Sequence, residues 1–181
     1  MRVEGPPERE YGFLFGNGII ARFLEVYYEG ADPSPTKAAR ILARGTGSAL
    51  IRGPYIRKLT RPFHGTLTLG DQRWGPRDFT AIAAGTVEQI GLGFRAFPLS
   101  RRHPGSIHVV GVTGSVVDLA LELPAIYLGK GVRRPGNFDE HGAAFRIESP
   151  ESMGFMIDGD FHTAERAIHV ARGPELSFLL P

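Results

Sequence analysis

Apolar residues recur at every second position through much of the chain, which is the spacing of β-strands. The clearest stretch runs from Met153 to Pro181, and its alternating apolar side chains are Phe155, Ile157, Ile168 and Val170. Asp158-Gly159 lies among them and favours a tight hairpin turn, because glycine accepts a positive φ without steric cost. This stretch therefore predicts three strands and two turns.

Four further segments carry the strand pattern, at 66–69, 77–84, 107–112 and 143–147. Gly70-Asp71 marks a turn between the first two of them. The charged run Ser100 to Gly105 is predicted to form another turn, immediately before the strand that begins at Ile107. The second half of the chain is therefore expected to be mostly β-structure.

Helical spacing predicts a helix from Ile19 to Tyr27, capped by Asn17. A second helix is predicted to begin at Ser34-Pro35, since serine caps helices and proline suits the first helical position. Gly45 is expected to end it, and a short separate helical segment follows at 48–51.

The third helix is predicted to begin at Ser115, because Ser-Val-Val-Asp is a capping-box pattern. Its apolar side chains are Val116, Leu119, Ala120 and Leu123. Pro124 is expected to end or kink it.

The 181 residues, 42% of them hydrophobic, suit one domain with a full core. Irregular glycine loops between short strands favour two packed antiparallel sheets over a parallel α/β sheet. The predicted fold is thus mainly β with helices, of the α+β class, as an antiparallel β-sandwich in a single domain over 1–181.

The formal charge of +2 is only mildly basic and calls for no nucleic-acid partner. Three small basic clusters could meet phosphate, although such clusters are more often solvated loops: Arg57, Lys58 and Arg61; Arg101 and Arg102; Lys130, Arg133 and Arg134. The chain has no cysteine, which excludes disulfides and thiol chemistry. No signal peptide and no transmembrane segment is recognisable, so we expect a soluble protein.

Complete catalytic motifs are missing. The sequence contains no His-Glu-x-x-His, no Gly-x-Ser-x-Gly and no phosphate-binding Gly-x-x-x-x-Gly-Lys-Ser/Thr loop. Gly16-Asn17-Gly18 before a helix is similar to a dinucleotide fingerprint, but the acidic residue expected about 20 positions on is only Asp32, in a loop. His108 and His169 lie in strand patterns, which favours a structural role for both.

Two turns could carry a site. Asp158 and Asp160 could present carboxylates to a ligand at the rim of a sheet, although the frequency of Asp-Gly turns favours a plain surface hairpin. Gly91-Leu92-Gly93 is predicted to bring backbone close to another group.

The order of several short motifs resembles the second domain of the diacylglycerol kinase family, which includes bacterial lipid kinases, sphingosine kinases and ceramide kinases. The motifs are Gly16 to Ala21, Gly91 to Gly93, Pro98 and the turn before Ile107, Ile157 to Asp160, and Gly173 to Pro181. The resemblance runs from about Tyr11 to the end of the chain. It covers half of that family's architecture.

This resemblance implies a β-sandwich that packs on an α/β nucleotide-binding domain, with the active site in the cleft between them. The nucleotide-binding domain, with its Gly-Gly-Asp-Gly-Thr signature, is absent here. The family's Asp-Gly-Glu turn implies nucleotide-side and metal-side roles for Asp158 and Asp160, with Asp160 as the metal candidate. Gly91 and Gly93 would supply backbone to the ligand cleft.

The family also has an Asp-Asp-Gly type turn before the equivalent of the Ile107 strand, and its aspartate takes the proton of the lipid hydroxyl. The matching turn here is Arg102-His103-Pro104-Gly105, and proline cannot take a proton. Loss of a general base typically costs a factor of about 10² to 10⁴ in rate. His103 is the candidate replacement, because histidine exchanges protons near neutral pH.

Two hypotheses follow. In one, the chain is the lipid-acceptor half of a lipid kinase, and a separate nucleotide-binding subunit brings ATP and Mg²⁺. In the other, it is a non-catalytic relative that binds a lipid or a partner, with no cofactor of its own. Both predict an exposed apolar surface that a homo-oligomer would cover, and a location in the cytoplasm or peripherally at a membrane.

Overall fold

The computed structural model describes residues 1–5, 9–29, 34–50 and 62–176. The predicted basic cluster at residues 57–61, the loop around Asp32 and the apolar ending 177–181 lie outside these residues. Among the described residues, no helix combines the length and the apolar character needed to cross a bilayer.

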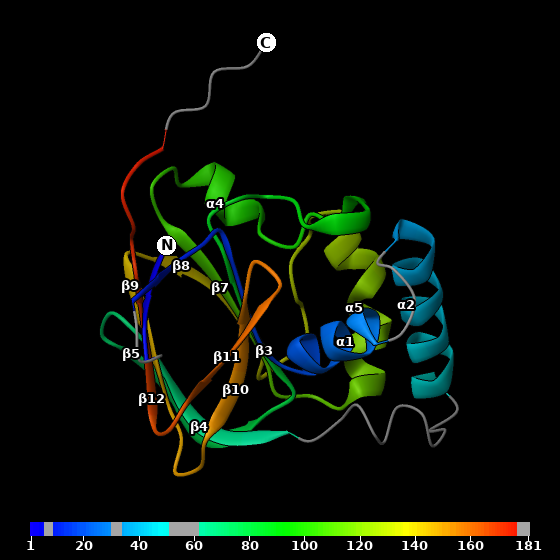
Figure 1. Cartoon of the computed structure of the whole chain (residues 1–181), viewed down its shortest axis with the longest axis horizontal. Coiled ribbons are helices and arrows are strands. Elements are labelled where there is room, and N and C mark those ends of the chain that lie inside the picture. Colours follow the sequence, from blue (N-terminus) through cyan, green and yellow to red (C-terminus); the bar gives the residue numbers. More distant parts are fainter. Residues whose placement is uncertain (6–8, 30–33, 51–61, 177–181) are drawn as a thin grey trace.

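Two antiparallel sheets form the body of the molecule (Figure 1). The first has the order β2 (Glu10–Tyr11), β1 (Arg2–Glu4), β12 (Ala167–Ala171), β9 (Ala144–Glu148), β4 (Phe63–Leu69) and β5 (Gln72–Phe79). The second has the order β11 (Asp160–Ala164), β10 (Met153–Ile157), β3 (Leu14–Gly18), β6 (Ala81–Gly85), β7 (Ile107–Val112) and β8 (Phe138–Gly142). The predicted fold class, α+β with antiparallel sheets, is confirmed.

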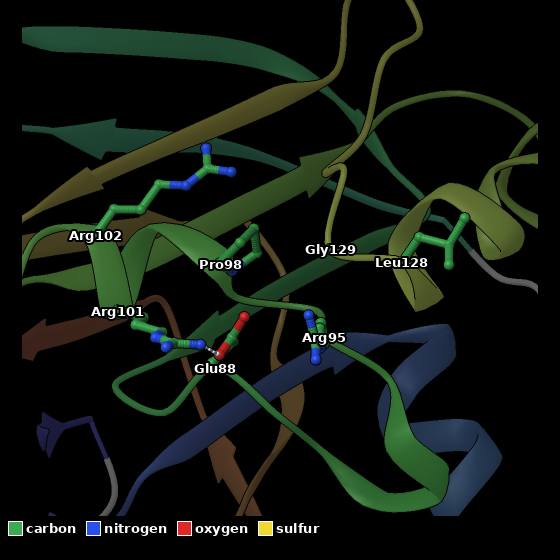
Figure 2. A pocket seen from close by; sticks show the side chains of 7 residues that line it. All are labelled: Glu88, Arg95, Pro98, Arg101, Arg102, Leu128 and Gly129. Carbon is green, nitrogen blue, oxygen red and sulfur yellow. Dashed lines mark hydrogen bonds and ion pairs between the residues drawn. The ribbon is translucent and has the colours of Figure 1, made fainter.

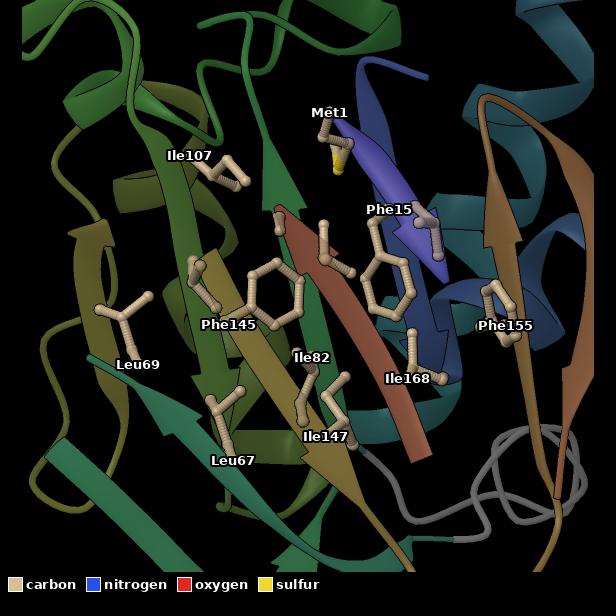
Figure 3. Close-up of a cluster of buried hydrophobic side chains, with 14 of the residues drawn as sticks. Met1, Phe15, Leu67, Leu69, Ile82, Ile107, Phe145, Ile147, Phe155 and Ile168 are labelled. Carbon is tan, nitrogen blue, oxygen red and sulfur yellow. The ribbon is translucent and has the colours of Figure 1, made fainter. Parts of the chain in front are cut away.

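The core lies between the two sheets (Figure 3). Phe15 of β3 stacks on Phe155 of β10, with ring centroids 5.5 Å apart, and meets Phe145 of β9 edge-on at 5.7 Å. Each ring is at most 2% exposed. Because aromatic pairs gain energy beyond their buried area, these rings hold the two sheets together.

Strand β7 of the second sheet is buried on both of its faces. Ile107 and Val109 of β7 point into the sandwich, whereas Val110 and Val112 point outward and are still buried. Their cover comes from α1 (Ile19–Tyr28) and α5 (Val116–Tyr127), with α2 (Pro35–Leu50) packed beyond them (Figure 1).

The cap of α1 differs from the prediction. Gly18 is the N-cap residue, with φ of 69°, and makes no side-chain cap bond. Asn17 is instead buried in β3, where its side-chain amide donates to the Gly154 carbonyl at 2.8 Å. A side chain at residue 18 would lie 2.4 Å from the Thr80 carbonyl oxygen, so only glycine fits there. Both neighbours of β3 are antiparallel, so this turn opens no dinucleotide-binding unit.

The second helix begins as predicted, since the Ser34 hydroxyl accepts a hydrogen bond from the Lys37 N–H at 3.2 Å. It does not end at Gly45, and residues 48–50 of the predicted separate segment belong to it, whereas residue 51 lies outside the described residues. A single helix, α2, continues to Leu50. Its contacts with α5 and with residues 91–93 outweigh the weak helix propensity of glycine.

The predicted strand 77–84 is wrong as one unit, because the chain changes sheets at Thr80. Phe79 ends β5 in the first sheet, and Ala81 begins β6 in the second. Thr80 holds this crossing, as its N–H donates to the Val112 carbonyl at 2.7 Å. Ser115 forms the predicted capping box with Asp118, and α5 passes through Pro124 before it ends at Tyr127.

Candidate functional site

One end of the second sheet gathers most of the predicted site residues. The registers Leu14↔Gly85, Gly85↔His108 and His108↔His141 place these positions at a common end of four strands. The turn after Ile157 belongs to that same end. Asp158 and Asp160 lie at its β10–β11 side, whereas His103 stacks on His141 of β8, at the opposite edge of the same sheet. The aspartates and His103 therefore share one end of the sheet but do not contact each other.

Asp158 uses its carboxylate to join two strands. Its oxygens accept from the Phe13 N–H at 2.9 and 3.0 Å and from the Leu14 N–H at 2.7 Å. Nearby, the Met1 ammonium donates to the Gly12 carbonyl; burial lowers the pKa of this ammonium, against the attraction of the Asp158 carboxylate. The turn is the predicted hairpin, with Asp158 at φ of 49° and Gly159 at 106°.

Asp160 begins β11 and is exposed. Within the described part of the chain its carboxylate makes no hydrogen bond or ion pair, so it is open to a ligand. No group of three or more His, Asp or Glu side chains in the described residues could hold a metal ion. One carboxylate is a poor site for Mg²⁺, which needs several oxygen ligands, so these residues do not fit a metal unaided.

His103 is exposed and follows α4 (Pro98–Arg102), for which it is the C-cap residue. The predicted turn at 100–105 is thus a short helix followed by a turn, since Pro98 presets the helical φ and the Ser100 hydroxyl donates to the Phe97 carbonyl at 2.7 Å. The His103 ring stacks on His141 of β8, with centroids 3.7 Å apart and planes within 9°. Stacking fixes the ring, and its nitrogens make no hydrogen bond or ion pair within the described residues.

Gly91 and Gly93 lie apart from both groups, in the short 3₁₀ turn η1 (Gly91–Gly93). A Cβ at Gly91 would meet no atom within 4 Å, and one at Gly93 would meet only Tyr127, at 3.6 Å. η1 packs against α2. The structure thus brings Gly93 close to α5 but places neither glycine beside His103 or the aspartates.

Two adjoining hollows open beside α4, with volumes of about 390 and 460 Å³. They share Pro98, Arg102 and Gly129. We call them together the basic groove, because their cationic side chains are Arg95, Arg101, Arg102, Lys130 and Arg133. Figure 2 shows the first hollow, with Arg95 and Arg102 on either side of Pro98 and Arg101 turned toward Glu88 at 3.2 Å. None of the predicted site residues lines either hollow.

The sequence already indicates some of the residues that line the basic groove. Arg101 with Arg102, and Lys130 with Arg133, stand out as basic clusters that could meet phosphate. Their sequence separation gives no sign that they face the same groove. Arg134 points elsewhere and pairs with Asp118 at 2.5 Å. The pKa of Asp118 is lowered mainly by the hydrogen bond from the Ser115 side chain, with Arg134 adding to the effect.

His108 is fully buried beneath the groove, with both ring nitrogens bonded. Its Nδ1 accepts from the Leu99 N–H at 3.3 Å, so Nε2 carries the proton that it donates to Asp139 at 2.5 Å. The structural role predicted for it therefore agrees with the geometry. The second Asp139 oxygen accepts from the Val132 N–H at 2.8 Å.

Solved structures with this fold are known, whereas no protein family profile and no curated protein matches the sequence. The crystal structure of a diacylglycerol kinase from Bacillus anthracis str. Sterne matches 95% of this chain and 50% of that one, with 13% identity and a TM-score of 0.53. Two further structures assigned as diacylglycerol kinases from the same organism match 96% and 94% of this chain. Their TM-scores are 0.60 and 0.56, at 13% and 14% identity, over 55% and 53% of their own length.

Identities this low establish the fold and nothing finer. The predicted resemblance to diacylglycerol kinases is confirmed at that level, and the chain spans about half the length of each of these structures.

Proposed function

We propose that this chain is the lipid-acceptor half of a diacylglycerol kinase-like lipid kinase. In this proposal it acts in ATP-dependent phosphorylation of a lipid hydroxyl only together with a separate nucleotide-binding half. The observation that supports it is the match of nearly the whole chain to only half of a diacylglycerol kinase. ATP and Mg²⁺ would be held mainly by the other half, and the chain would work in the cytoplasm at a membrane surface.

Two residues have roles in this proposal. In the transfer, the lipid oxygen bonds to the γ-phosphorus of ATP, ADP leaves, and the hydroxyl proton must go to a base. His103 would be that base, because the residue is exposed and its ring is stacked on His141. Asp160, an open carboxylate on β11 at the opposite edge of the same sheet, would face the nucleotide side.

The test is phosphate transfer from radiolabelled ATP to diacylglycerol or a sphingoid base in mixed micelles. We expect no transfer by the chain alone, and transfer when a subunit carrying Gly-Gly-Asp-Gly-Thr is added. His103→Ala should then reduce the rate by about 10² to 10⁴. Arg73→Ala, on the edge strand β5 of the opposite sheet, should leave it unchanged. Transfer by the chain alone would refute the proposal.

A second candidate function is a non-catalytic lipid- or partner-binding protein. Two turns favour this alternative. In the 157–160 turn, the Asp158 carboxylate is already hydrogen-bonded to backbone N–H groups. The 102–105 turn contains no carboxylate that could act as a base. Under this alternative the chain binds its partner subunit or lipid vesicles, and no transfer appears with any added half. Unchanged lipid binding in His103→Ala would agree with it.

A further inference from the structure

We propose that the basic groove is a binding site for a phosphate monoester. Five cationic side chains and two carboxylates, those of Glu88 and Asp139, line the groove, so its net formal charge is +3. The formal charge of the entire chain is only +2. Positive charge is therefore concentrated at this one place, and a concave surface lined by one sign of charge attracts ligands of the other sign.

Four of the five cations are not neutralised by the protein. Arg101 is paired with Glu88, but Arg95, Arg102, Lys130 and Arg133 have no ion pair or side-chain hydrogen bond among the described residues. The Asp139 carboxylate is committed to His108 and to the Val132 N–H. Like charges held around one hollow repel each other, and an anion bound between them would relieve that repulsion.

The two walls of the groove are tied together from below. On one side, the Leu99 N–H of α4 donates to the buried His108 ring. On the other side, Asp139 accepts from His108 and from Val132 in the loop that carries Lys130 and Arg133. This chain of bonds fixes the spacing between Arg102 and Lys130 without using either side chain.

A second carboxylate fixes the same loop. Glu122 of α5 is 6% exposed and accepts from the Arg133 N–H at 3.0 Å and the Arg134 N–H at 2.8 Å. Buried carboxylates are costly unless they are hydrogen-bonded, so the loop is held firmly in this conformation. A prearranged set of donors loses less entropy when a ligand binds than a set on free loops.

The chemistry of the groove fits a phosphate monoester better than a diester. A monoester carries a charge between −1.5 and −2 at neutral pH and has three terminal oxygens that accept from several donors at once. Arginine side chains can each give two parallel hydrogen bonds to such a group. The volumes of about 390 and 460 Å³ accommodate a phosphate with a small attached group, such as a glycerol unit.

The experiment measures binding by the chain alone, without ATP or any other subunit, so it is independent of the proposed transfer. The soluble probe is glycerol 3-phosphate, followed by titration calorimetry. The membrane probes are phosphatidylcholine vesicles that contain phosphatidic acid, a monoester, or phosphatidylglycerol, a diester, followed by co-sedimentation. We expect binding to glycerol 3-phosphate, and weaker or no binding to phosphatidylglycerol vesicles.

The variant Arg102→Glu/Lys130→Glu reverses one charge on each wall. It should weaken binding at least tenfold, since hydrogen bonds to charged groups stabilise by more than the roughly 1.4 kcal/mol that tenfold represents. The matched control is Arg73→Glu, an exposed arginine on β5 that should bind like the wild type. Both side chains in the double variant are exposed, so far-UV circular dichroism should stay unchanged.

Binding to phosphatidic acid vesicles as well would identify a lipid headgroup as the source of the phosphate, whereas binding to the soluble probe alone would identify a free phosphate ester. Both results support the proposal. Absence of binding to both monoester probes would overturn it. Equal loss in Arg73→Glu, or equal binding to phosphatidylglycerol, would also overturn it, because each would indicate general attraction to anions.

Discussion

Asp158 forms part of the β10–β11 turn and also bonds to a segment that is distant in the sequence. Its carboxylate accepts from the Phe13 and Leu14 N–H groups, and these bonds join the β10–β11 turn to the start of β3. Asp158→Asn keeps the shape and tolerates the positive φ, but it loses the charge and one acceptor oxygen. We expect a loss of about 1–2 kcal/mol in the free energy of unfolding, measured by urea titration.

The matched control is Asp160→Asn, two residues further on. Asp160 is exposed and makes no side-chain bond within the described residues, so the free energy of unfolding should change by less than about 0.5 kcal/mol. Similar losses in the two variants would show that the bonds of Asp158 contribute nothing specific to stability.

Residue-scale prediction from the sequence succeeded for the Asp158-Gly159 turn, because a local dipeptide decides it. It could not identify the partners of Asp158, which lie about 145 positions earlier in the chain. The basic groove is a similar case. Arg102 and Lys130 each stand out in the sequence, but they come together only because His108 and Asp139 connect their segments.

The element most open to test is α2, which continues through Gly45. A Cβ at Gly45 would meet no atom within 4 Å, and the helical φ suits any residue. Gly45→Ala should therefore raise the free energy of unfolding by about 0.5–1 kcal/mol, because alanine has the higher helix propensity. Thermal and urea unfolding would both report this gain.

Gly70 provides the matched control, since a Cβ there would also meet no atom within 4 Å but its φ is +55°. Gly70→Ala should lower the free energy of unfolding by about 1–2 kcal/mol through backbone strain. The two variants differ in backbone conformation and not in available space. A stabilising Gly70→Ala or a destabilising Gly45→Ala would contradict this account.

Elements were predictable from the sequence where local signals decide them. The capping box at Ser115 and the strand 107–112 are examples. Two of the wrong predictions, at Gly45 and Thr80, share a cause. Contacts with distant elements carry α2 past its glycine and move the chain from one sheet to the other at Thr80, and no local pattern encodes such contacts.

At the scale of the whole molecule, the single-domain prediction has a direct test in Trp74, the only tryptophan. Trp74 lies on β5 of the first sheet and packs on Phe138 of β8 in the second, with ring centroids 3.8 Å apart. Its fluorescence therefore reports the contact between the sheets, whereas far-UV circular dichroism reports the strands themselves. If both sheets depend on the shared core, the two signals should change at one common urea midpoint.

Ile82→Val sharpens this test, because Ile82 is fully buried in β6 of the second sheet, while Trp74 is on the first. Removal of one methylene group should cost about 0.5–1.5 kcal/mol. In a cooperative domain the fluorescence and dichroism midpoints shift together to the same lower urea concentration, since neither sheet can bury its inner face without the other. A dichroism change in two steps, only one of which moves in Ile82→Val, would show that the sheets unfold separately, and the chain would then comprise two folding units.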